Sequence, residues 1–513
     1  MWSVENSKNN EARKIVWEII PYVRGRCLDI GAGAYKVLPH FIAVDNGGHW
    51  GRTGVDVVAE AHDLSLFASQ SCDTLFSSHL LEHIEYEKVP DVLKEWARVA
   101  KQGGYLILYV PDEAQYPLVG TEFANHDHKW NCNYDNVVAV MEKVAKGWDL
   151  IDYQVRSETD EYSLFFVFQL KQGRTHEFSW KLPKHEKTCA IVRYGAYGDM
   201  VQTASLFPWL KEQGYHITLY CQASGVDVVK YDPHIDRFII QEKDAVPPVL
   251  LAEFWDATKK KYDHWINLCE SIEGTLLAVP GRVNHEWPNE LRAKYLDRNY
   301  SEWTHELAGV PPPYNPKFYA TLEEKAWARR TAQRWGRRNI LWSLAGSSGH
   351  KTWPHLDTVI ANIMIEYNDV HVVLVGDELC RLLETGWEKE PRVHCQSGKW
   401  TIRESMAFAE ASDLIIGTET GLLNAAGHME VPKIITLSHS SKEMLTKHWK
   451  NTIALEQPKG VGCPKQPCRQ LHTTWDYCMK HESGTAQCQW EIGPEAMWDA
   501  IVEVFGVPQK KVA

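Results

Sequence analysis

The stretch RCLDIGAGA at residues 26–34 sets a pattern for the whole chain, in which an apolar run leads into a turn with glycines. CAIVRYGAYG at residues 189–198 and NILWSLAGSSG at residues 339–349 repeat it, each followed by a segment of helical length. Further strand-like runs lie between these stretches, at residues 41–45, 74–78, 105–110, 217–221, 371–376 and 414–417. Strands that alternate with helix-length segments indicate parallel sheets covered by helices on both faces. We therefore predict an α/β protein.

Two segments divide the chain into lobes. Residues 171–186 are polar and form a predicted linker, and GVPPPYNPK at residues 309–317 forms a proline-rich bridge that is stiff and poor in backbone donors. The predicted lobes are residues 1–170, 187–312 and 316–513. This number agrees with the chain length, since a domain takes about 100–200 residues.

Composition narrows the class of protein. The net charge is −12 and no long basic run is present, so binding to nucleic acid is not expected. No stretch approaches the roughly 18 apolar residues that span a bilayer, and the start, MWSVENSKNNEARK, lacks the apolar core of a secretory signal. The twelve cysteines are mostly isolated in apolar segments, as reduced thiols are. We expect a cytoplasmic protein without a transmembrane segment, while peripheral association with a membrane stays open.

The first lobe carries an ordered series of acids and glycines. In LDIGAGAYK a strand delivers Asp29, and Gly31 and Gly33 let the backbone turn tightly enough for a cofactor to approach the main chain. Asp45 ends the next strand, where a carboxylate can bind ribose hydroxyls, and Asp63 follows in AHDLSLF. The series resembles class I SAM-dependent methyltransferases. The resemblance implies a Rossmann-like domain that binds S-adenosyl-L-methionine (SAM), with Asp29, Gly31 and Gly33 at the methionine part, Asp45 at the ribose and Asp63 near the adenine.

The series departs from that family in two places. Ala34 stands where a third glycine is usual, and only sixteen residues separate Asp29 from Asp45, so the first helix must be truncated. These departures leave two functions open for the lobe, namely methylation or a non-catalytic docking role.

Two histidine-bearing segments of this lobe allow other chemistry. HLLEH at residues 79–83 matches the pattern of inverted zinc proteases, but it directly follows a strand, at a place where the methyltransferase family often has a similar stretch. Zinc catalysis is therefore not expected there. FANHDHKW at residues 123–130 is either a solvated loop or the source of a base, through His126 or His128, because imidazole titrates near neutrality.

Three segments of the remaining chain carry a second set of candidates. RYGAYGDM at residues 193–200 places Asp199 at the start of a helix, where a carboxylate can take a proton from a sugar hydroxyl or simply cap the helix. SLAGSSGHKTWP at residues 343–354 joins a turn rich in backbone and hydroxyl donors to Lys351, which are the parts needed to hold a diphosphate. LIIGTETGLLNAAGHMEVPKI at residues 414–434 supplies another turn whose helix N-terminus can face phosphate.

Together these segments resemble glycosyltransferase family 9, the ADP-heptose:lipopolysaccharide heptosyltransferase type, across residues 187–505. The resemblance implies a GT-B fold of two Rossmann-like lobes, an acceptor lobe followed by a nucleotide-sugar donor lobe. It also implies Asp199 as the catalytic base, Lys351 at the donor phosphates and Glu378, or Asp377, at the donor ribose.

One departure concerns the donor. Glu419, Thr420 and Gly421 stand where the family has Asp-Thr-Gly near the donor, so the acid is one methylene longer. This leaves the donor sugar open. The family generally inverts the anomeric centre without a catalytic metal.

The C-terminal part of the chain holds a cysteine cluster. Cys463, Cys468, Cys478 and Cys488 fall within 26 residues and are spaced C-x4-C-x9-C-x9-C. Four thiols this close can bind Zn²⁺ tetrahedrally, but the tight C-x2-C pair typical of such sites is absent. We expect reduced or redox-labile thiols, with structural zinc as the alternative.

The function predicted from these motifs is a bifunctional transferase. One half transfers a sugar from an ADP-heptose-like nucleotide donor to a glycan acceptor, and the other half uses SAM for methylation. The alternatives are a glycosyltransferase with a non-catalytic docking domain, and a glycosyltransferase that acts on modified DNA. Because the net charge is −12, a DNA acceptor is less expected than a glycan acceptor.

Overall fold

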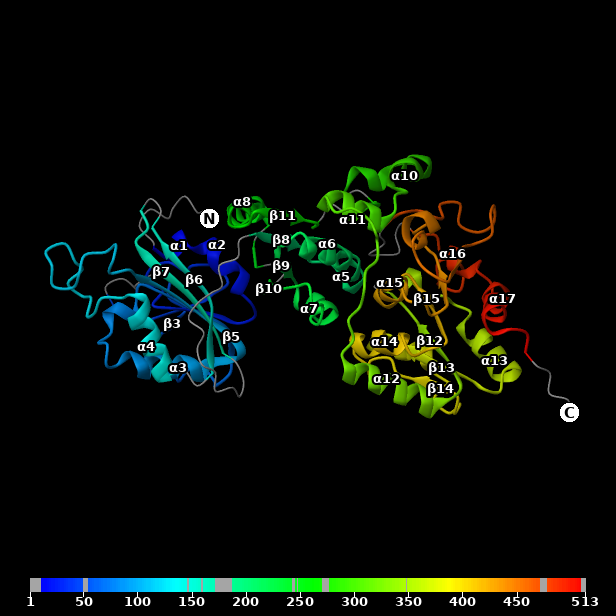
Figure 1. Ribbon diagram of the computed structural model, residues 1–513, viewed down its shortest axis with the longest axis horizontal. Helices are drawn as coiled ribbons and strands as arrows, with labels where there is room; N and C mark the ends of the chain where they lie inside the picture. The colour runs from blue at the N-terminus through cyan, green and yellow to red at the C-terminus, as the bar shows by residue number, and fades with distance from the viewer. Residues whose placement is uncertain are drawn as a thin grey trace. The chain divides into compact units, whose positions relative to one another are not determined.

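The structure is a computed structural model that describes residues 11–48, 54–144, 147–157, 160–170, 187–241, 245–246, 248–269, 276–346, 348–470 and 478–508. The predicted linker, residues 171–186, lies outside the described residues. The chain forms two compact units, one of residues 1–186 with 239–262 and one of residues 187–238 with 263–513 (Figure 1). The predicted fold class is confirmed, because the described strands form three mainly parallel sheets with helices packed on them.

The sheet of the first unit has seven strands in the order β3-β2-β1-β4-β5-β7-β6. The strands run parallel from β3 to β5, and β7 is antiparallel to both β5 and β6. Their bounds are β1 (Cys27–Ile30), β2 (Ile42–Asp45), β3 (Val57–Val58), β4 (Cys72–Ser78), β5 (Ala100–Pro111), β6 (Trp148–Arg156) and β7 (Ser163–Leu170). This is a doubly wound sheet extended by a hairpin.

Helices cover both faces of this sheet, which is why its central strands are apolar on both sides. One face packs against α3 (Val89–Val99) and α4 (Tyr134–Val144), with Trp96 and Met141 fully buried. The other face packs against α1 (Glu11–Lys14), α2 (Val16–Ile19) and α8 (Leu251–Thr258). Helix α8 belongs to the stretch 187–312 in sequence, yet its Phe254 is fully buried in the core of the first unit.

The second unit starts with a four-stranded sheet in the order β10-β9-β8-β11. Its strands are β8 (Thr188–Val192), β9 (His216–Cys221), β10 (Arg237–Ile240) and β11 (His264–Asn267), and its helices include α5 (Tyr197–Thr203), α6 (Phe207–Glu212) and α7 (Ala223–Val229). Two further helices follow, α10 (Asn289–Leu296) and α11 (Tyr300–Ala308).

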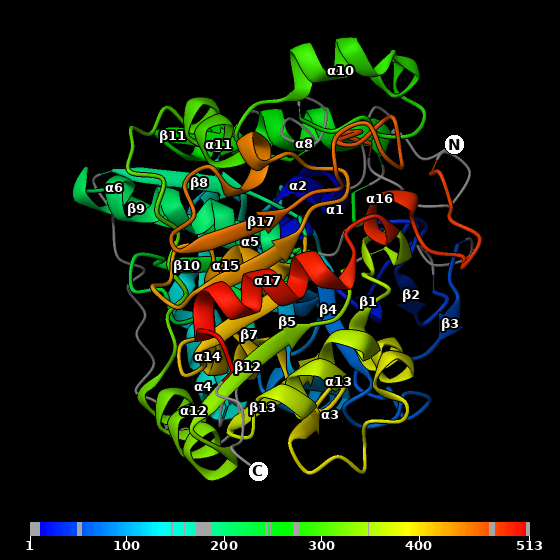
Figure 2. The same cartoon turned by 90° about the vertical axis from the view of Figure 1, so that its right-hand side faces the viewer.

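The second sheet of this unit has six parallel strands in the order β14-β13-β12-β15-β16-β17. The strands are β12 (Arg338–Ser343), β13 (Val370–Val375), β14 (Val393–Cys395), β15 (Leu414–Thr418), β16 (Lys433–Thr436) and β17 (Thr452–Leu455). One face packs against α12 (Leu322–Trp335), α14 (Ile402–Ala409) and α15 (Gly421–Ala426), and the other against α13 (Leu356–Glu366) and α17 (Pro494–Phe505). Figure 2 shows α17 lying across β16 and β17.

All three sheets share one topological feature that positions the candidate sites. In each, the first strand in chain order lies between the second and the fourth, so the connections leave in opposite directions and a crevice opens at the carboxyl ends. The crevices lie at β1 and β4, at β8 and β11, and at β12 and β15. The three glycine turns of the sequence follow β1, β8 and β12. No helix in the described part of the chain is long and apolar enough to cross a membrane.

Candidate active sites

The first unit has a cavity of about 600 Å³ at the crevice between β1 and β4. Its walls are the turns that follow β1, β2, β3 and β4 and the start of α3, and Gly31, Asp45 and His83 are among the lining residues. Gly31 and Gly33 both have positive φ, +78° and +58°, which favours glycine. A Cβ on Gly31 would also lie 2.8 Å from Leu80. Both glycines therefore shape the turn as the sequence predicts, and the volume is in the range typical of small-molecule sites.

The three predicted acids lie in different environments. Asp45 lines the cavity, and its carboxylate accepts hydrogen bonds from the backbone N–H groups of Gly33 and Gly47, both at 3.1 Å. Asp29 is fully buried and accepts a hydrogen bond from the Val37 N–H at 2.7 Å, so it holds the turn that replaces the first helix. Burial raises the pKa of Asp29 to about 7. Residues 31–41 form turns and bends, and the prediction of a truncated first helix is confirmed.

Asp63 lies away from the cavity. It is exposed, its carboxylate accepts a hydrogen bond from the Ser65 N–H at 3.1 Å, and the cavity wall in the described structure is formed instead by its neighbours Glu60 and His62. The sequence pattern pointed to the right turn but to a different residue in it, because the direction of a loop side chain is not visible in spacing.

The loop after β4 brings HLLEH next to FANHDHKW. Leu81–His83 form one short 3₁₀ turn, so the residues do not share one helical face as a zinc protease would require. The Trp130 indole donates to the Leu81 carbonyl at 2.9 Å, and the Lys129 N–H donates to the Glu82 carbonyl at 2.7 Å. These two bonds hold His128 beside Glu82 and His83.

Within this pair of loops, His126 and His128 differ. His126 is exposed, whereas His128 is buried and its ring packs edge-on to His83 with the centroids 4.8 Å apart. Burial lowers the pKa of His128, against the nearby Glu82, which would raise it. Of the two candidate bases, His128 is thus the residue beside the cavity wall.

Asp199 lies at the crevice between β8 and β11, in the first turn of α5. Its Oδ1 accepts a hydrogen bond from the Tyr300 hydroxyl at 2.5 Å and pairs with the Arg193 guanidinium at 2.9 Å. Its Oδ2 accepts a hydrogen bond from the Ala196 N–H at 2.7 Å, and its side chain is 25% exposed. The carboxylate is therefore fixed in orientation while it still reaches solvent.

Arg193 and Tyr300 are the functional candidates of this site that sequence reasoning missed. Arg193 is buried and donates to the Tyr300 hydroxyl at 2.8 Å and to the Leu268 carbonyl at 3.0 Å. It thereby ties the turn after β8 to the chain after β11. Arg193 stands in the motif that identified Asp199, but Tyr300 lies 101 residues further on and carries no local signal.

The two lobes of the second unit meet through α5 and α15. The amide of Asn424 accepts a hydrogen bond from Gln202 at 3.0 Å. A Cβ on Gly421 would lie 2.7 Å from the Cβ of Tyr197 and 3.1 Å from the N of Gly198. Gly421 is therefore needed for the close approach of the two helices, which places Asp199 near the turn that follows β15.

Lys351, Glu419 and Thr420 come together at the crevice between β12 and β15. Lys351 is buried, and its Nζ donates to the Glu419 carbonyl at 3.3 Å. The Thr420 hydroxyl lies 3.1 Å from that of Ser343 and caps α15 by accepting from the Leu423 N–H at 3.3 Å. The structure thus brings together the predicted lysine and the predicted turn.

The carboxylate of Glu419 is occupied by the loop after β16. Its Oε1 accepts from the N–H groups of Ser438 and Ser440 at 3.1 and 2.9 Å, and its Oε2 contacts the Ser438 hydroxyl and lies 2.8 Å from Nδ1 of His439. Burial alone would raise the pKa of Glu419, but the charge and hydrogen bond of His439, with Lys351 and Ser438, hold it well below its usual range.

The residues predicted at the donor ribose follow β13. Glu378 has a side chain that is 80% exposed and pairs with Arg381 at 3.2 Å. Asp377 caps the following 3₁₀ helix (Glu378–Glu384), since its Oδ1 accepts from the Cys380 N–H at 3.1 Å. Both residues are exposed, and they differ in that the carboxylate of Asp377 already accepts the capping hydrogen bond.

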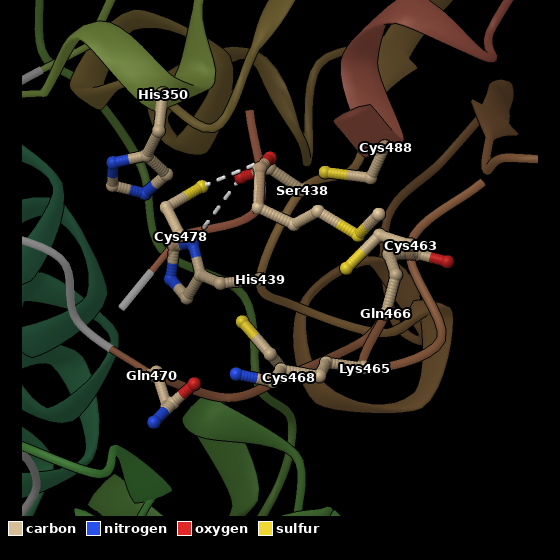
Figure 3. A pocket seen from close by; sticks show the side chains of 11 residues that line it. His350, Ser438, His439, Cys463, Lys465, Gln466, Cys468, Gln470, Cys478 and Cys488 are labelled. Atoms are coloured by element: carbon tan, nitrogen blue, oxygen red, sulfur yellow. Dashed lines mark hydrogen bonds between the residues drawn. The ribbon is translucent and has the colours of Figure 1, made fainter. Parts of the chain in front are cut away.

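The four C-terminal cysteines line one small cavity of about 20 Å³, together with His350 and His439 (Figure 3). Burial raises the pKa of Cys468 to about 12 and that of Cys478 to about 11, so both sulfurs carry protons at neutral pH. None of the four forms a disulfide. The structure brings the four sulfurs to one cavity, and the choice between reduced thiols and structural zinc stays a prediction.

Comparison with known proteins agrees with the resemblance predicted for the first lobe. Residues 28–108 match the family model of a methyltransferase domain. This match confirms the predicted resemblance to methyltransferases for this stretch of the first lobe. No curated protein matches the chain.

Solved structures similar to parts of the chain include glycosyltransferases and methyltransferases. A glycosyltransferase of family 9 from Veillonella parvula is 15% identical, with 62% of this chain and 97% of that chain covered and a TM-score of 0.45. The E. coli ADP-heptose LPS heptosyltransferase II is also 15% identical, with 62% and 98% covered and a TM-score of 0.44. A SAM-dependent methyltransferase from Archaeoglobus fulgidus is 16% identical, with 32% and 97% covered and a TM-score of 0.25.

Proposed function

We propose that the second unit transfers a sugar from a nucleoside-diphosphate donor to a glycan, and that the first unit transfers a methyl group from SAM. The observation that supports the glycosyl half most strongly is the Asp199 carboxylate, oriented by Arg193, Tyr300 and the Ala196 N–H yet still open to solvent. A base needs both properties, because it must be held in place and must reach the acceptor hydroxyl.

In the glycosyl half, Asp199 takes the proton of the acceptor hydroxyl as its oxygen attacks the anomeric carbon. The bond from that carbon to the diphosphate breaks on the opposite face, so the configuration inverts. Lys351 and the donors of the turn after β12 offset the charge that develops on the leaving diphosphate. Glu378 contacts the donor ribose, and Glu419 and Thr420 hold the turn beside the donor. We propose a donor of the ADP-heptose type.

The variant Asp199→Asn tests the glycosyl half, because it keeps the shape of the side chain and removes the carboxylate that acts as the base. With ADP-heptose and a glycan extract of the source cells, we expect ADP release to fall by about 10²–10⁴-fold. Asp227→Asn serves as the matched control, because Asp227 is an exposed aspartate on α7 that pairs with Lys230. Equal ADP release by Asp199→Asn and the wild type would exclude Asp199 as the base.

For the methyl half, the cavity at β1 and β4 fits a cofactor of the size of SAM, and Asp45 lies in its wall. SAM supplies an electrophilic methyl group on a sulfonium. Gly31 and Gly33 let the cofactor reach the main chain, Asp45 holds its ribose, and Asp29 fixes the turn that carries both glycines.

Transfer of tritium from methyl-labelled SAM to the same glycan extract tests the methyl half. We expect Asp45→Ala to lower the incorporated label about tenfold or more, whereas the exposed Asp63→Ala retains it. Binding of SAM without any incorporation would support the docking alternative instead.

A further inference from the structure

Glu82 is a fully buried acid with an unusual environment. Within the described structure, neither of its carboxyl oxygens has a hydrogen-bond partner. The nearest polar side-chain atoms are Nδ1 of His79 at 3.3 Å and Nε2 of His128 at 3.9 Å from Oε1, outside hydrogen-bond geometry. A buried polar group without a partner is rare in proteins and calls for a ligand or a functional reason.

Two imidazoles are placed to share a ligand with this carboxyl group. One ligand atom each of Glu82, His83 and His128 lies within 4.8 Å of the other two. The three residues come from two loops that are held together by the Lys129 N–H bond to the Glu82 carbonyl and the Trp130 indole bond to the Leu81 carbonyl. The arrangement is therefore built by the fold and does not depend on a chance approach of mobile side chains.

Backbone strain is found at the same place. His79 has φ of +49°, a conformation that a residue other than glycine rarely adopts. Its Nε2 lies 3.1 Å from the Ser163 hydroxyl, and its Nδ1 faces Glu82. Strain of this kind persists where the surroundings impose it, and it concentrates at functional sites.

We propose that Glu82, His83 and His128 bind one divalent transition-metal ion at the wall of the cofactor cavity. Two neutral imidazoles and one carboxylate are a ligand set that suits first-row divalent ions. Nδ1 of His79, 3.3 Å from Oε1 of Glu82, helps to orient the carboxylate. Because His83 also lines the cavity, the ion lies beside the space in which an acceptor meets SAM.

The role of the ion rests on the proposed methyl transfer, whereas its binding does not. A hydroxyl of the acceptor binds the ion and loses its proton to water, because coordination to a cation makes the proton more acidic. The oxygen's electron pair forms the new O–CH₃ bond, and the S–CH₃ bond breaks with its pair left on sulfur as a neutral thioether. The substrate class that follows is an alcohol, such as a sugar hydroxyl.

Mn²⁺ is the probe that separates this site from the C-terminal thiols, since it favours nitrogen and oxygen ligands over thiolates. We expect electron paramagnetic resonance to show one Mn²⁺ bound by the full-length protein in the absence of SAM. Glu82→Gln and His128→Ala should each weaken binding about tenfold or more, while His126→Ala, two residues away in the same loop, should bind as the wild type does. Circular dichroism and binding of S-adenosylhomocysteine confirm that the variants are folded.

Three results would overturn the proposal. These are no Mn²⁺ binding by the wild type at millimolar ion, unchanged binding by folded Glu82→Gln and His128→Ala, or an equal loss in His126→Ala. Methyl transfer that is absent while Mn²⁺ still binds would count against the proposed function and leave the metal site supported.

Discussion

Glu82 and Glu419 occupy matching positions in two different sheets. Each is buried and follows the fourth strand of its sheet in chain order, β4 or β15, beside the crevice. Glu419 is surrounded by two backbone N–H groups, the Ser438 hydroxyl and His439, whereas Glu82 has no hydrogen-bond partner among the described residues. A buried glutamate in the segment after the fourth strand thus stabilises the fold in one unit and, on our proposal, binds a metal in the other.

Asp29 is intermediate between Glu82 and Glu419 in the number of its hydrogen-bond partners. It is as buried as Glu82, but it accepts one hydrogen bond, from Val37. Burial raises its pKa to about 7, while His439 and Lys351 outweigh burial at Glu419 and lower the pKa there. The comparison teaches that partners, and not burial alone, decide whether an acid at a crevice stabilises the fold.

The largest change in the free energy of unfolding is expected from Glu419→Gln, because this variant removes one partner of a buried ion pair. The second unit should lose about 3–5 kcal/mol at neutral pH. Since the folded pKa of Glu419 lies below its unfolded value, its stabilisation is present above about pH 4.3 and is lost as the pH falls further, so the deficit should shrink below pH 4. Urea unfolding followed by hydrogen exchange of each unit measures this. An unchanged free energy of unfolding of the second unit would show that Glu419 does not stabilise the fold.

Asp29→Asn should stabilise the protein, whereas Glu419→Gln destabilises it, and its effect should depend differently on pH. The folded protein holds the Asp29 proton up to about pH 7, but the unfolded chain releases it near pH 3.9, so the wild type loses stability from about pH 4 to 7. The variant keeps the bond to Val37 and should be at most about 4 kcal/mol more stable than the wild type at pH 8, since one pKa unit corresponds to about 1.4 kcal/mol. Thermal unfolding of the first unit at pH 5 and pH 8 tests this. A difference that is the same at both pH values would show that Asp29 does not titrate in this range.

The smallest of the three effects is expected from Glu82→Gln. In metal-free buffer the neutral amide should stabilise the first unit by about 1–2 kcal/mol, because it removes a carboxyl group that is buried without a hydrogen bond. Added Mn²⁺ should raise the unfolding temperature of the wild type and leave that of the variant unchanged. If Glu82→Gln were destabilised in metal-free buffer, Glu82 would stabilise the fold as Glu419 does.

Much of this architecture could be predicted from the sequence. The β-type runs at residues 41–45, 217–221, 371–376 and 414–417 correspond to strands, and the glycine turns lie at the three crevices, because local apolar patterning and glycine placement encode both. The antiparallel hairpin of β6 and β7 was missed. Its first strand, WDLIDYQVR, mixes apolar and polar residues and is only partly buried, whereas β7 is a nearly continuous apolar run.

The contacts that could not be predicted join residues far apart in the chain. Tyr300 reaches Asp199 across 101 residues, and His128 joins Glu82 through two loops with no shared pattern. Asp63 has the expected residue type in the expected turn but faces solvent. Spacing defines which turn meets a crevice, whereas the direction of each side chain depends on tertiary packing.

The central claim is that one chain has two separate ligand sites, and crossed calorimetry tests it most directly. S-adenosylhomocysteine and ADP are titrated into the wild type, Asp45→Ala and Lys351→Ala. We predict that the wild type binds one of each, that Asp45→Ala loses S-adenosylhomocysteine alone and that Lys351→Ala loses ADP alone. A wild type that binds only one of the two ligands, or a variant that loses both, would contradict the account.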